Sequence, residues 1–425
     1  MKIKFVNAVI FNPAKDEKIE GCLISDKGII TYIGKDNNDT ADKIIDCKGK
    51  YLIPGLVDIH VHLREPGQTQ KEDIISGCNA AVAGGVTSLI AMPNTNPAVD
   101  NADTLDYINR RAKLAKCRVY QACAITKGLQ GDENVDFDLM IKHGAIAFSD
   151  DGRPVENSRL MLNALKYASE NNIPVLSHTE DLYLASGGKI NEGIVSKKIG
   201  IQGIPSCAED SGTAREIALC ESTGYKVHIC HVSTKGGFEM LRDAKARGVK
   251  VTLETCPHYF TLTEDCLLAK NADFRMNPPL RTESDRLACI EAIKNGTVDA
   301  ISTDHAPHTA EEKSDFEKAP NGSIGMETSL SISYTALCKS GEIDFMHLLK
   351  LMSTNPAKIA NLDAGRLEVG APADIVVFDK DVEYVIDKNK LHGKSTNCPF
   401  DKMKVNGRVL LTVVRGEIVY NFEEE

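Results

Sequence analysis

The strongest constraint on the fold is an alternation of short apolar runs with helix-length segments between residues 53 and 364. Eight runs have the length of buried strands, and parallel strands need a crossover connection, usually a helix, between them. The runs are "LVDIHVHL", "VTSLIAMP", "RVYQACAIT", "AIAFSDD", "PVLSH", "YKVHICHVS", "VKVTLETCPH" and "VDAISTDHAP". This pattern predicts an α/β fold, a (β/α)8 TIM barrel over residues 53–364.

Both ends of the chain have a different pattern. Residues 1–52 alternate short β-like runs such as "KIKFVNAVIF" with turn residues, and residues 365–425 do the same in "GAPADIVVFD" and "KVNGRVLLTVVRGEIVY". We therefore predict that residues 1–52 and 365–425 together build one small β-sandwich-like domain. The dipeptide Asn406-Gly407 lies between two apolar runs and predicts a hairpin turn there.

Composition excludes several classes of protein. The 50 basic and 60 acidic residues give a net charge of −10, and no Lys/Arg block provides a face for nucleic acid. No run approaches the roughly 20 apolar residues of a membrane span. The 13 cysteines are an odd number without a CxxC pair, which favours reduced thiols over a disulfide framework. Since the basic start does not resemble a signal peptide, we expect a cytoplasmic protein.

Two histidines lie at the end of the first barrel run. In "GLVDIHVHLREPG", His60 and His62 are two residues apart, so on a strand they share a face and can reach one ion. A pair of hydrogen-bonded core histidines is the alternative interpretation. Other barrel runs also end in ionisable groups, which are His178, His231, Asp304 and the neighbours Asp150 and Asp151.

The carboxyl ends of barrel strands form one rim, where TIM-barrel active sites are built. Burying imidazoles and carboxylates there without partners would be costly, whereas divalent metal ions satisfy them together. Six such ligands exceed the three or four that one zinc ion takes from a protein. The rim therefore predicts two Zn2+ ions per subunit, bridged by a carboxylate and a hydroxide.

Two assignments within this set depend on side-chain alternation. His228 and His231 differ by three positions, so they face opposite sides of a strand. His231 lies nearer the rim and is the predicted ligand, while His228 is predicted to be structural or to point outward. The choice between Asp150 and Asp151 stays open, because alternation decides little where a strand frays.

Several motifs stand out along nearly the whole chain. They are "PGLVDIHVHLREPG", "AMPNTNP", "FSDDGRPV", "LSHTED", "HICHVST", "MNPPLR", "STDHAPH" and "GAPADIVVFD". In combination they resemble the amidohydrolase superfamily and, within it, the dihydroorotases of the longer bacterial type. The HxH element alone would indicate only the superfamily.

The resemblance implies a specific set of metal ligands. It implies that His60, His62 and Asp304 bind the first zinc, that His178 and His231 bind the second, and that Asp151 bridges them. Many relatives bridge their metals with a carboxylated lysine at the end of the fourth strand. "GAIAFSDDGRP" contains no lysine, which matches the branch that uses an aspartate.

The resemblance also implies a set of substrate contacts. They are His62, Arg64, Asn94, Asn277, His308, Asn321 and Gly322. Turn formation beside proline is the alternative role of Asn94 and Asn277. The family usually has an aromatic residue at the position of Asn321, so Asn321 is a departure. The polar segment 305–327 suits a mobile loop that closes over substrate, and a plain surface loop is its alternative.

The implied reaction is the reversible hydrolysis of the cyclic amide of (S)-dihydroorotate to N-carbamoyl-L-aspartate, with cyclisation serving pyrimidine biosynthesis. A hydroxide bridging the metals is the expected nucleophile, and Asp304 is the expected general base and then acid. Arg64 fits a small anionic substrate, which a net-acidic protein must capture locally. The resemblance also implies a homodimer, and association with aspartate carbamoyltransferase stays open.

Three alternatives compete with this interpretation. A hydantoinase acts on neutral substrates, which gives no reason for a carboxylate-binding Arg64. An allantoinase is disfavoured by the missing lysine of the fourth strand, although the motifs alone do not exclude it. A non-catalytic homologue that acts as a scaffold belongs to a different class, and six filled ligand positions argue against it.

Overall fold

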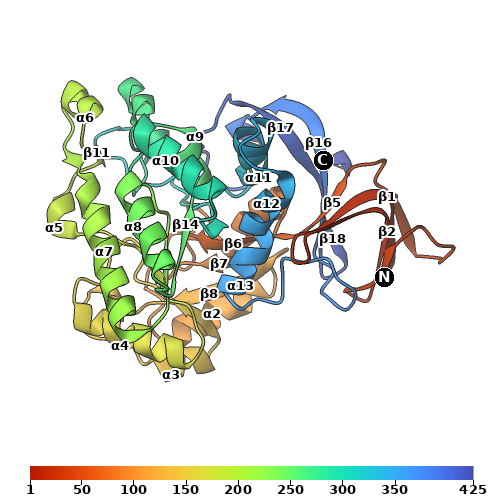
Figure 1. The fold of residues 1–425 in the computed structure, drawn as a ribbon, viewed down its shortest axis with the longest axis horizontal. Helices are drawn as coiled ribbons and strands as arrows, with labels where there is room; N and C mark the ends of the chain where they lie inside the picture. Colours follow the sequence, from red (N-terminus) through yellow and green to blue (C-terminus); the bar gives the residue numbers. More distant parts are fainter. Residues whose placement is uncertain (425) are drawn as a thin grey trace.

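The protein is described here by a computed structural model that covers residues 1–424, with a barrel at one side and a sheet at the other (Figure 1). Within these residues eight short strands run parallel around the barrel. They are β6 (Leu56–Val61), β7 (Val86–Ala91), β8 (Arg118–Cys123), β9 (Ala145–Phe148), β10 (Leu176–Ser177), β13 (Val227–Ile229), β14 (Val251–Thr255) and β15 (Ala300–Ile301). Each strand lies inside one of the eight predicted runs.

The barrel closes through backbone bridges between its two halves. One half has the order β6-β7-β8-β9 and the other has the order β10-β13-β14-β15. Parallel bridges join Phe148 to Val175 at one seam and Val61 to His305 at the other. The predicted (β/α)8 barrel is therefore confirmed.

Helices follow the barrel strands and cover the outside of the barrel (Figure 1). The helices are α1 (Ile74–Ala83), α2 (Ala102–Ala112), α3 (Phe137–Lys142), α4 (Ser158–Glu170), α5 (Leu182–Ala185), α6 (Ile194–Ile199), α7 (Ser206–Thr223), α8 (Lys235–Ala246), α9 (Pro257–Thr261), α10 (Glu283–Lys294), α11 (Ser329–Ser333), α12 (Phe345–Leu349) and α13 (Asn355–Ile359). In α8, Thr234 caps the first turn by accepting from the Gly237 N–H, while Phe238, Leu241 and Ala244 form the buried face. That spacing of three residues is what an amphipathic helix on a sheet requires.

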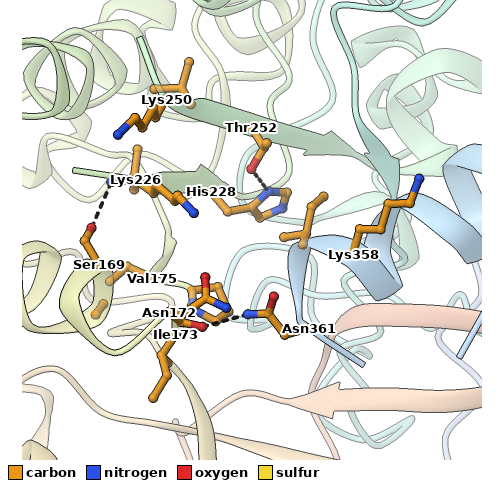
Figure 2. Close-up of a pocket in the computed structure, with 15 residues that line it drawn as sticks. Ser169, Asn172, Ile173, Val175, Lys226, His228, Lys250, Thr252, Lys358 and Asn361 are labelled. Atoms are coloured by element: carbon orange, nitrogen blue, oxygen red, sulfur yellow. Dashed lines mark hydrogen bonds between the residues drawn. The ribbon is translucent and has the colours of Figure 1, made fainter. Parts of the chain in front are cut away.

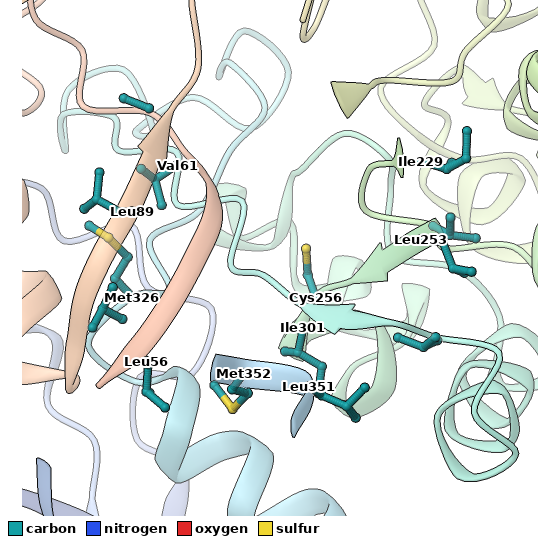
Figure 3. Packing of buried hydrophobic residues seen from close by; sticks show 14 of the residues in the cluster. Leu56, Val61, Leu89, Ile229, Leu253, Cys256, Ile301, Met326, Leu351 and Met352 are labelled. Atoms are coloured by element: carbon teal, nitrogen blue, oxygen red, sulfur yellow. The ribbon is translucent and has the colours of Figure 1, made fainter. Parts of the chain in front are cut away.

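The main apolar core lies between the barrel strands and these helices. Figure 3 shows Leu56, Leu89 and Ile301 among the side chains of this cluster. Met352, from the segment between α12 and α13, packs in the same cluster and is 3% exposed. The strands are thus held by packing on their outer side, which leaves their carboxyl ends free to carry polar groups.

The two ends of the chain form one mixed sheet beside the barrel, and both termini lie there (Figure 1). Over the described residues it has eight strands, in the order β18-β17-β16-β5-β1-β2-β3 with β4 beside β1. The strands are β1 (Lys2–Asn12), β2 (Glu17–Asp26), β3 (Ile29–Gly34), β4 (Lys43–Asp46), β5 (Tyr51–Pro54), β16 (Ile375–Val385), β17 (Lys404–Val414) and β18 (Glu417–Asn421). The antiparallel pairing of β5 with β16 joins the two ends of the chain, as predicted.

The predicted hairpin at Asn406-Gly407 is wrong, because β17 runs straight through both residues. A Cβ at Gly407 would lie 2.2 Å from the Phe378 ring, so this glycine allows close packing of β17 on β16. The turn instead lies at Arg415 and Gly416, which join β17 to β18 with φ of 49° and 76°. Two consecutive positive φ values are typical of a tight hairpin turn.

Two further strands, β11 (Ile190–Asn191) and β12 (Gly203–Ile204), pair in parallel outside the barrel.

Among residues 1–424, every helix is too short or too polar to span a membrane. In the same part of the chain all 13 cysteines are free.

Candidate metal centre and substrate pocket

The ionisable groups at the strand ends meet around the side chain of Asp151. Its Oδ1 lies 3.2 Å from His60 Nε2, 3.6 Å from His178 Nδ1 and 3.5 Å from His231 Nε2. Its Oδ2 lies 3.4 Å from His62 Nε2. All five side chains are buried. The ends of β6, β9, β10 and β13 thus bring four imidazoles to one carboxylate.

Asp150 has a different role from its neighbour. Its Oδ1 accepts hydrogen bonds from the backbone N–H groups of Ile125 at 2.6 Å and Thr126 at 3.1 Å, and its Oδ2 accepts from the Thr126 hydroxyl. Burial raises the pKa of Asp150 to about 6. Asp150 therefore holds the loop after β8, and Asp151 is the residue of the pair that faces the histidines.

Asp304 approaches the same cluster from the end of β15. Its Oδ1 lies 3.0 Å from His62 Nε2 and 3.6 Å from His60 Nε2. Burial would raise the pKa of Asp304, but the hydrogen bond with His62 and the charges of nearby histidines lower it instead. The structure thus holds Asp304 as a carboxylate at the edge of the cluster.

Three residues around this cluster have a left-handed backbone. The φ angles are 60° at Arg64, 40° at His231 and 47° at Asp304. L-residues rarely adopt such angles, and surrounding contacts must compensate their cost of order 1–3 kcal/mol each. Each follows a barrel strand, so the backbone turns sharply where the side chain enters the site.

The outer nitrogens of two histidines bind oxygens of other side chains. His60 Nδ1 lies 3.0 Å from Glu254 Oε1, and His62 Nδ1 lies 2.8 Å from Asn94 Oδ1. Each Nδ1 therefore carries the proton, and each Nε2 points its lone pair at Asp151 and Asp304. A second proton or a metal ion must stand between that nitrogen and the carboxylates.

Glu254 was not predicted as part of the site. This β14 carboxylate contacts His60 through Oε1, while its Oε2 lies 3.3 Å from His228 Nε2 and accepts from the Ser302 hydroxyl. An acidic residue in the middle of the buried run "VTLET" was the signal in the sequence. His228 also contacts Thr252 Oγ1 at 2.9 Å through Nδ1, which agrees with the structural role predicted for it.

The donor set fits divalent metal ions. Within the described part of the chain, His60 Nε2, Asp151 Oδ1 and His231 Nδ1 are buried without a hydrogen-bond partner. Two groups offer ligand atoms within 4.8 Å of one another, and they are His60, His62, Asp151 and Asp151, His178, His231. Both contain Asp151, as expected of a carboxylate shared between two ions.

A third group of potential ligands fits a metal less well. It consists of His60, Cys230 and Glu254. Burial raises the pKa of the Cys230 thiol to about 12, so the sulfur is protonated rather than a thiolate. Both Glu254 oxygens already have partners, and this group therefore serves as support for His60.

The charges of the histidines agree with the same interpretation. Burial disfavours protonation of His178, but Asp151 and Glu180 outweigh it and raise the pKa of His178 to about 10. The pKa of His60 is raised well above its usual value because Asp151 likewise outweighs burial. The carboxylates thus attract positive charge into this cluster, which a metal dication supplies when bound.

Beside the cluster lies a guanidinium without a salt-bridge partner in the described chain, although the charges of Asp304, Asp151 and Glu312 act on it. Arg64 is 9% exposed, its Nε donates to the Pro307 carbonyl at 3.2 Å, and its Nη2 lies 3.3 Å from His308 Nε2. Among residues 1–424, Arg64 forms no ion pair with Asp or Glu. Burial lowers the pKa of Arg64 to about 10, so it stays cationic at neutral pH.

His308 is neutral next to this cation. Burial and the charge of Arg64 lower the pKa of His308 to about 3. A buried cation beside a neutral imidazole is costly without a counterion. The pocket formed by Arg64 and His308 is therefore suited to an anion.

Comparison with known proteins agrees with this geometry. The family model described as "Amidohydrolase family" matches residues 51–419. A dihydroorotase of Acetivibrio thermocellus is 47% identical over 399 residues, covering 93% of this chain and 94% of that protein. A dihydroorotase of Syntrophotalea carbinolica is 42% identical over 428 residues, covering 100% of both. The chain belongs to the amidohydrolase family, in its dihydroorotase branch.

A solved structure from the same family has the same architecture. The L-hydantoinase (dihydropyrimidinase) from Arthrobacter aurescens has a TM-score of 0.88 and 25% identity, and the match covers 99% of this chain and 96% of that chain. The barrel and the terminal sheet of this amidohydrolase are thus shared with a related cyclic amidohydrolase.

The two predicted asparagines support the histidines of this amidohydrolase site. Asn94 accepts from His62, and its Nδ2 lies 3.4 Å from Asp151 Oδ2. Asn277 donates from Nδ2 to Glu180 Oε2 at 3.2 Å, and Glu180 contacts His178 at 3.5 Å. Both asparagines therefore border the cluster, and turn formation is not their whole role.

Asn321 and Gly322 approach the pocket through their backbone. The Asn321 carbonyl lies 2.9 Å from His308 Nε2, whereas its side chain accepts from Arg275 Nη2 at 3.1 Å. A Cβ at Gly322 would lie 2.8 Å from the Cβ of Ala306, and its φ is 139°. A glycine is thus needed at 322, while the Asn321 side chain is directed to Arg275.

The predicted loop at residues 305–327 is anchored along its length. The His305 carbonyl accepts from the His62 N–H at 2.8 Å. Asn397 Nδ2 donates to the carbonyls of Ala306 at 3.1 Å and Gly322 at 3.0 Å. Lys313, which is 8% exposed, donates to the carbonyls of Pro320 and Gly322 within the segment and of Arg275 outside it. This segment places His308 over Arg64.

Proposed function

We propose that this amidohydrolase is a two-zinc dihydroorotase, which interconverts (S)-dihydroorotate and N-carbamoyl-L-aspartate. The observation that carries the proposal is the buried guanidinium of Arg64, which has no salt-bridge partner among the described residues, beside the histidine and carboxylate cluster. A cyclic amide that bears a carboxylate needs both features, one to hold the anion and one to act on the amide.

In this proposal, His60, His62 and Asp304 hold one zinc ion, His178 and His231 hold the other, and Asp151 is shared. Two zinc ions, when bound, would lower the pKa of water toward neutrality and polarise the amide carbonyl. Support comes from His60 Nε2 and Asp151 Oδ1, which lie 3.2 Å apart and have no hydrogen-bond partner within residues 1–424. Such atoms are otherwise expensive to bury.

Arg64 orients the substrate by binding its carboxylate. The guanidinium offers N–H donors in a planar fork, and a carboxylate can accept two of them at once. His308, Asn94, Asn277 and the backbone of residues 321–322 border the same space and would contact the ring or the carboxylate. Anchoring the carboxylate at one end places the amide toward Asp304, which lies beside His62.

Asp304 moves the proton in this scheme. As a carboxylate it accepts a proton from the attacking water, and it then donates that proton to the ring nitrogen as the amide bond breaks. In the direction of cyclisation the same carboxyl takes the proton from the carbamoyl nitrogen. Asp304 is thus the proposed base in one direction and the proposed acid in the other.

A comparison of three substrates tests the proposal. We expect zinc-loaded protein with about two zinc ions per chain to turn over dihydroorotate and to leave allantoin and dihydrouracil nearly untouched. Turnover of allantoin or dihydrouracil at a comparable rate would replace the assignment by another cyclic amidohydrolase. A protein that binds zinc and acts on none of the three would support the scaffold alternative.

The assembly and location are part of the same proposal. We expect a homodimer in the cytoplasm, and light scattering on the purified protein would measure the oligomeric state. Association with aspartate carbamoyltransferase would be tested by co-sedimentation of the two purified proteins.

A further inference from the structure

A second cavity lies at the opposite end of the barrel from the metal centre. Its volume is about 380 Å3, and it is bordered by the amino ends of β10, β13 and β14, the end of α4, and α13 (Figure 2). The metal centre lies at the carboxyl ends of the same strands. The two sites are therefore separated by the length of the barrel strands.

Three lysines border this cavity, and acidic residues are absent from its described lining. Lys226 and Lys250 lie on one side and Lys358 on the other, as Figure 2 shows. All three are exposed, and their ammonium groups form no ion pair or hydrogen bond within residues 1–424. The protein carries a net charge of −10, whereas the three unpaired lysines make the surroundings of this cavity positive.

The register of the barrel places two of these cations side by side. Val227 of β13 pairs with Val251 of β14, and the Val227 N–H donates to the Lys250 carbonyl at 3.3 Å. Lys226 and Lys250 therefore start neighbouring parallel strands next to each other. Like charges in adjacent positions repel, and an anion between them would relieve that repulsion.

The walls of the cavity are largely apolar. Val175, Val227, Val251 and Ile359 line it, and the first three are buried. His228 is also buried there, with its Nδ1 2.9 Å from Thr252 Oγ1 and its Nε2 3.3 Å from Glu254 Oε2. The cavity thus offers an apolar surface for the body of a ligand and ammonium groups for its charge.

We propose that this cavity is a second binding site, which takes a small organic phosphate with an apolar or aromatic body. The volume is near the lower end of the range for small-molecule sites, about 300 to 1,000 Å3. A phosphate dianion matches several ammonium groups better than a single carboxylate does. The site shares no residue with the metal centre or the Arg64 pocket, and its nearest link to them is His228, which contacts Glu254, which in turn contacts His60.

The test uses the zinc-loaded full-length protein and phenyl phosphate as the probe. Isothermal titration calorimetry in saturating N-carbamoyl-L-aspartate, which occupies the catalytic pocket, is expected to show one binding event per chain. Inorganic phosphate and phenol are each expected to bind more weakly than phenyl phosphate. Inorganic phosphate that binds as tightly would contradict a role for the apolar walls.

Two charge-matched variants locate the site. The triple variant Lys226→Met, Lys250→Met, Lys358→Met is expected to weaken phenyl phosphate binding by about tenfold or more. The control variant Lys27→Met, Lys116→Met, Lys198→Met removes the same charge from exposed positions elsewhere and should leave the affinity unchanged. Equal weakening by both variants, or no binding of phenyl phosphate to the wild-type protein, would overturn the proposal.

Discussion

The guanidinium of Arg64 is buried beside a neutral imidazole, with a backbone carbonyl as its hydrogen-bond acceptor. A buried cation such as this one is stabilised when an anionic group of a ligand binds beside it. Arg64 therefore links the architecture to a class of substrate, whereas the histidines alone point only to a metal-dependent hydrolase.

The first prediction concerns the pH dependence of substrate capture. Because burial lowers the pKa of Arg64 to about 10, the cation is present below that pH and is lost as the pH rises through it. We expect kcat/KM for dihydroorotate to fall above about pH 10, and a pH–rate profile measures this. Arg64→Lys should move the fall to lower pH, since an ammonium is less basic than a guanidinium. A fall at the same pH in both proteins would show that another group titrates.

The second prediction concerns Glu254, which orients His60. Glu254→Gln should reduce zinc affinity by about 10- to 100-fold, because the Nδ1–H of His60 loses its carboxylate acceptor. Competition with a chelator of known affinity measures the change. Thr252→Val is the matched control, since it removes a contact of His228 and leaves the Glu254–His60 contact in place. Equal affinities in wild type and Glu254→Gln would show that Glu254 does not tune the metal centre.

At the scale of single residues, the sequence predicted the groups at the carboxyl ends of the strands better than Glu254, which lies in the middle of one. His60, His62, His178 and His231 end apolar runs, and the structure brings all four to Asp151. The choice of Asp151 over Asp150 depended on the backbone N–H groups of Ile125 and Thr126, which come from another loop. Alternation along one strand could not have predicted that contact.

At the scale of elements, the buried side chain of Lys313 is one of the anchors of the segment 305–327. Lys313 Nζ donates to the carbonyls of Arg275 at 3.2 Å, Pro320 at 3.0 Å and Gly322 at 2.9 Å. These contacts tie the segment to the stretch after α9 that also carries Asn277. The position of His308 over Arg64 therefore depends on a lysine that is not itself in the pocket.

The third prediction follows from these contacts. Lys313→Met removes three hydrogen bonds that hold the segment, and each lost hydrogen bond costs of order 1 kcal/mol. We expect KM for dihydroorotate to rise more than kcat falls, with faster proteolysis within residues 305–327. Lys318→Met is the control, because Lys318 lies in the same segment with its side chain 86% exposed. An unchanged KM in Lys313→Met would show that the segment is positioned without this lysine.

Helices and strands were predicted well where the sequence has a clear helical period or a clear run of apolar residues. All eight barrel runs contain the expected strand, because a buried parallel strand leaves a continuous apolar signal. The hairpin at Asn406-Gly407 was wrong, because the glycine there serves packing against Phe378 rather than a turn. Local sequence does not distinguish these two uses of a glycine, since the ring that requires it is 29 positions away in the chain.

At the scale of the whole molecule, the cluster around Asp151 draws its side chains from both halves of the barrel. These side chains and Asp304 lie on or just after β6, β9, β10, β13 and β15, so an ion held by them would connect both halves of the barrel. An ion that binds the folded state stabilises it by about 2.7 kcal/mol at a free concentration about 100 times its Kd.

The fourth prediction is that metal removal lowers thermal stability. Dialysis against a chelator should lower Tm, and zinc should restore it, as scanning calorimetry with metal analysis would measure. The reason is that the partially paired carboxylates and imidazoles around Asp151 stay buried without their cation. An unchanged Tm after complete removal of metal would show that these residues are satisfied without an ion.

The central claim is that Arg64 selects a cyclic amide that carries a carboxylate. The most direct test compares dihydroorotate with dihydrouracil, which has the same ring without the carboxylate, in wild type and Arg64→Met. We predict that wild type prefers dihydroorotate by about 100-fold or more in kcat/KM, and that Arg64→Met loses most of that preference. Equal losses for both substrates in Arg64→Met would contradict the claim, because Arg64 would then support the site without recognising the anion.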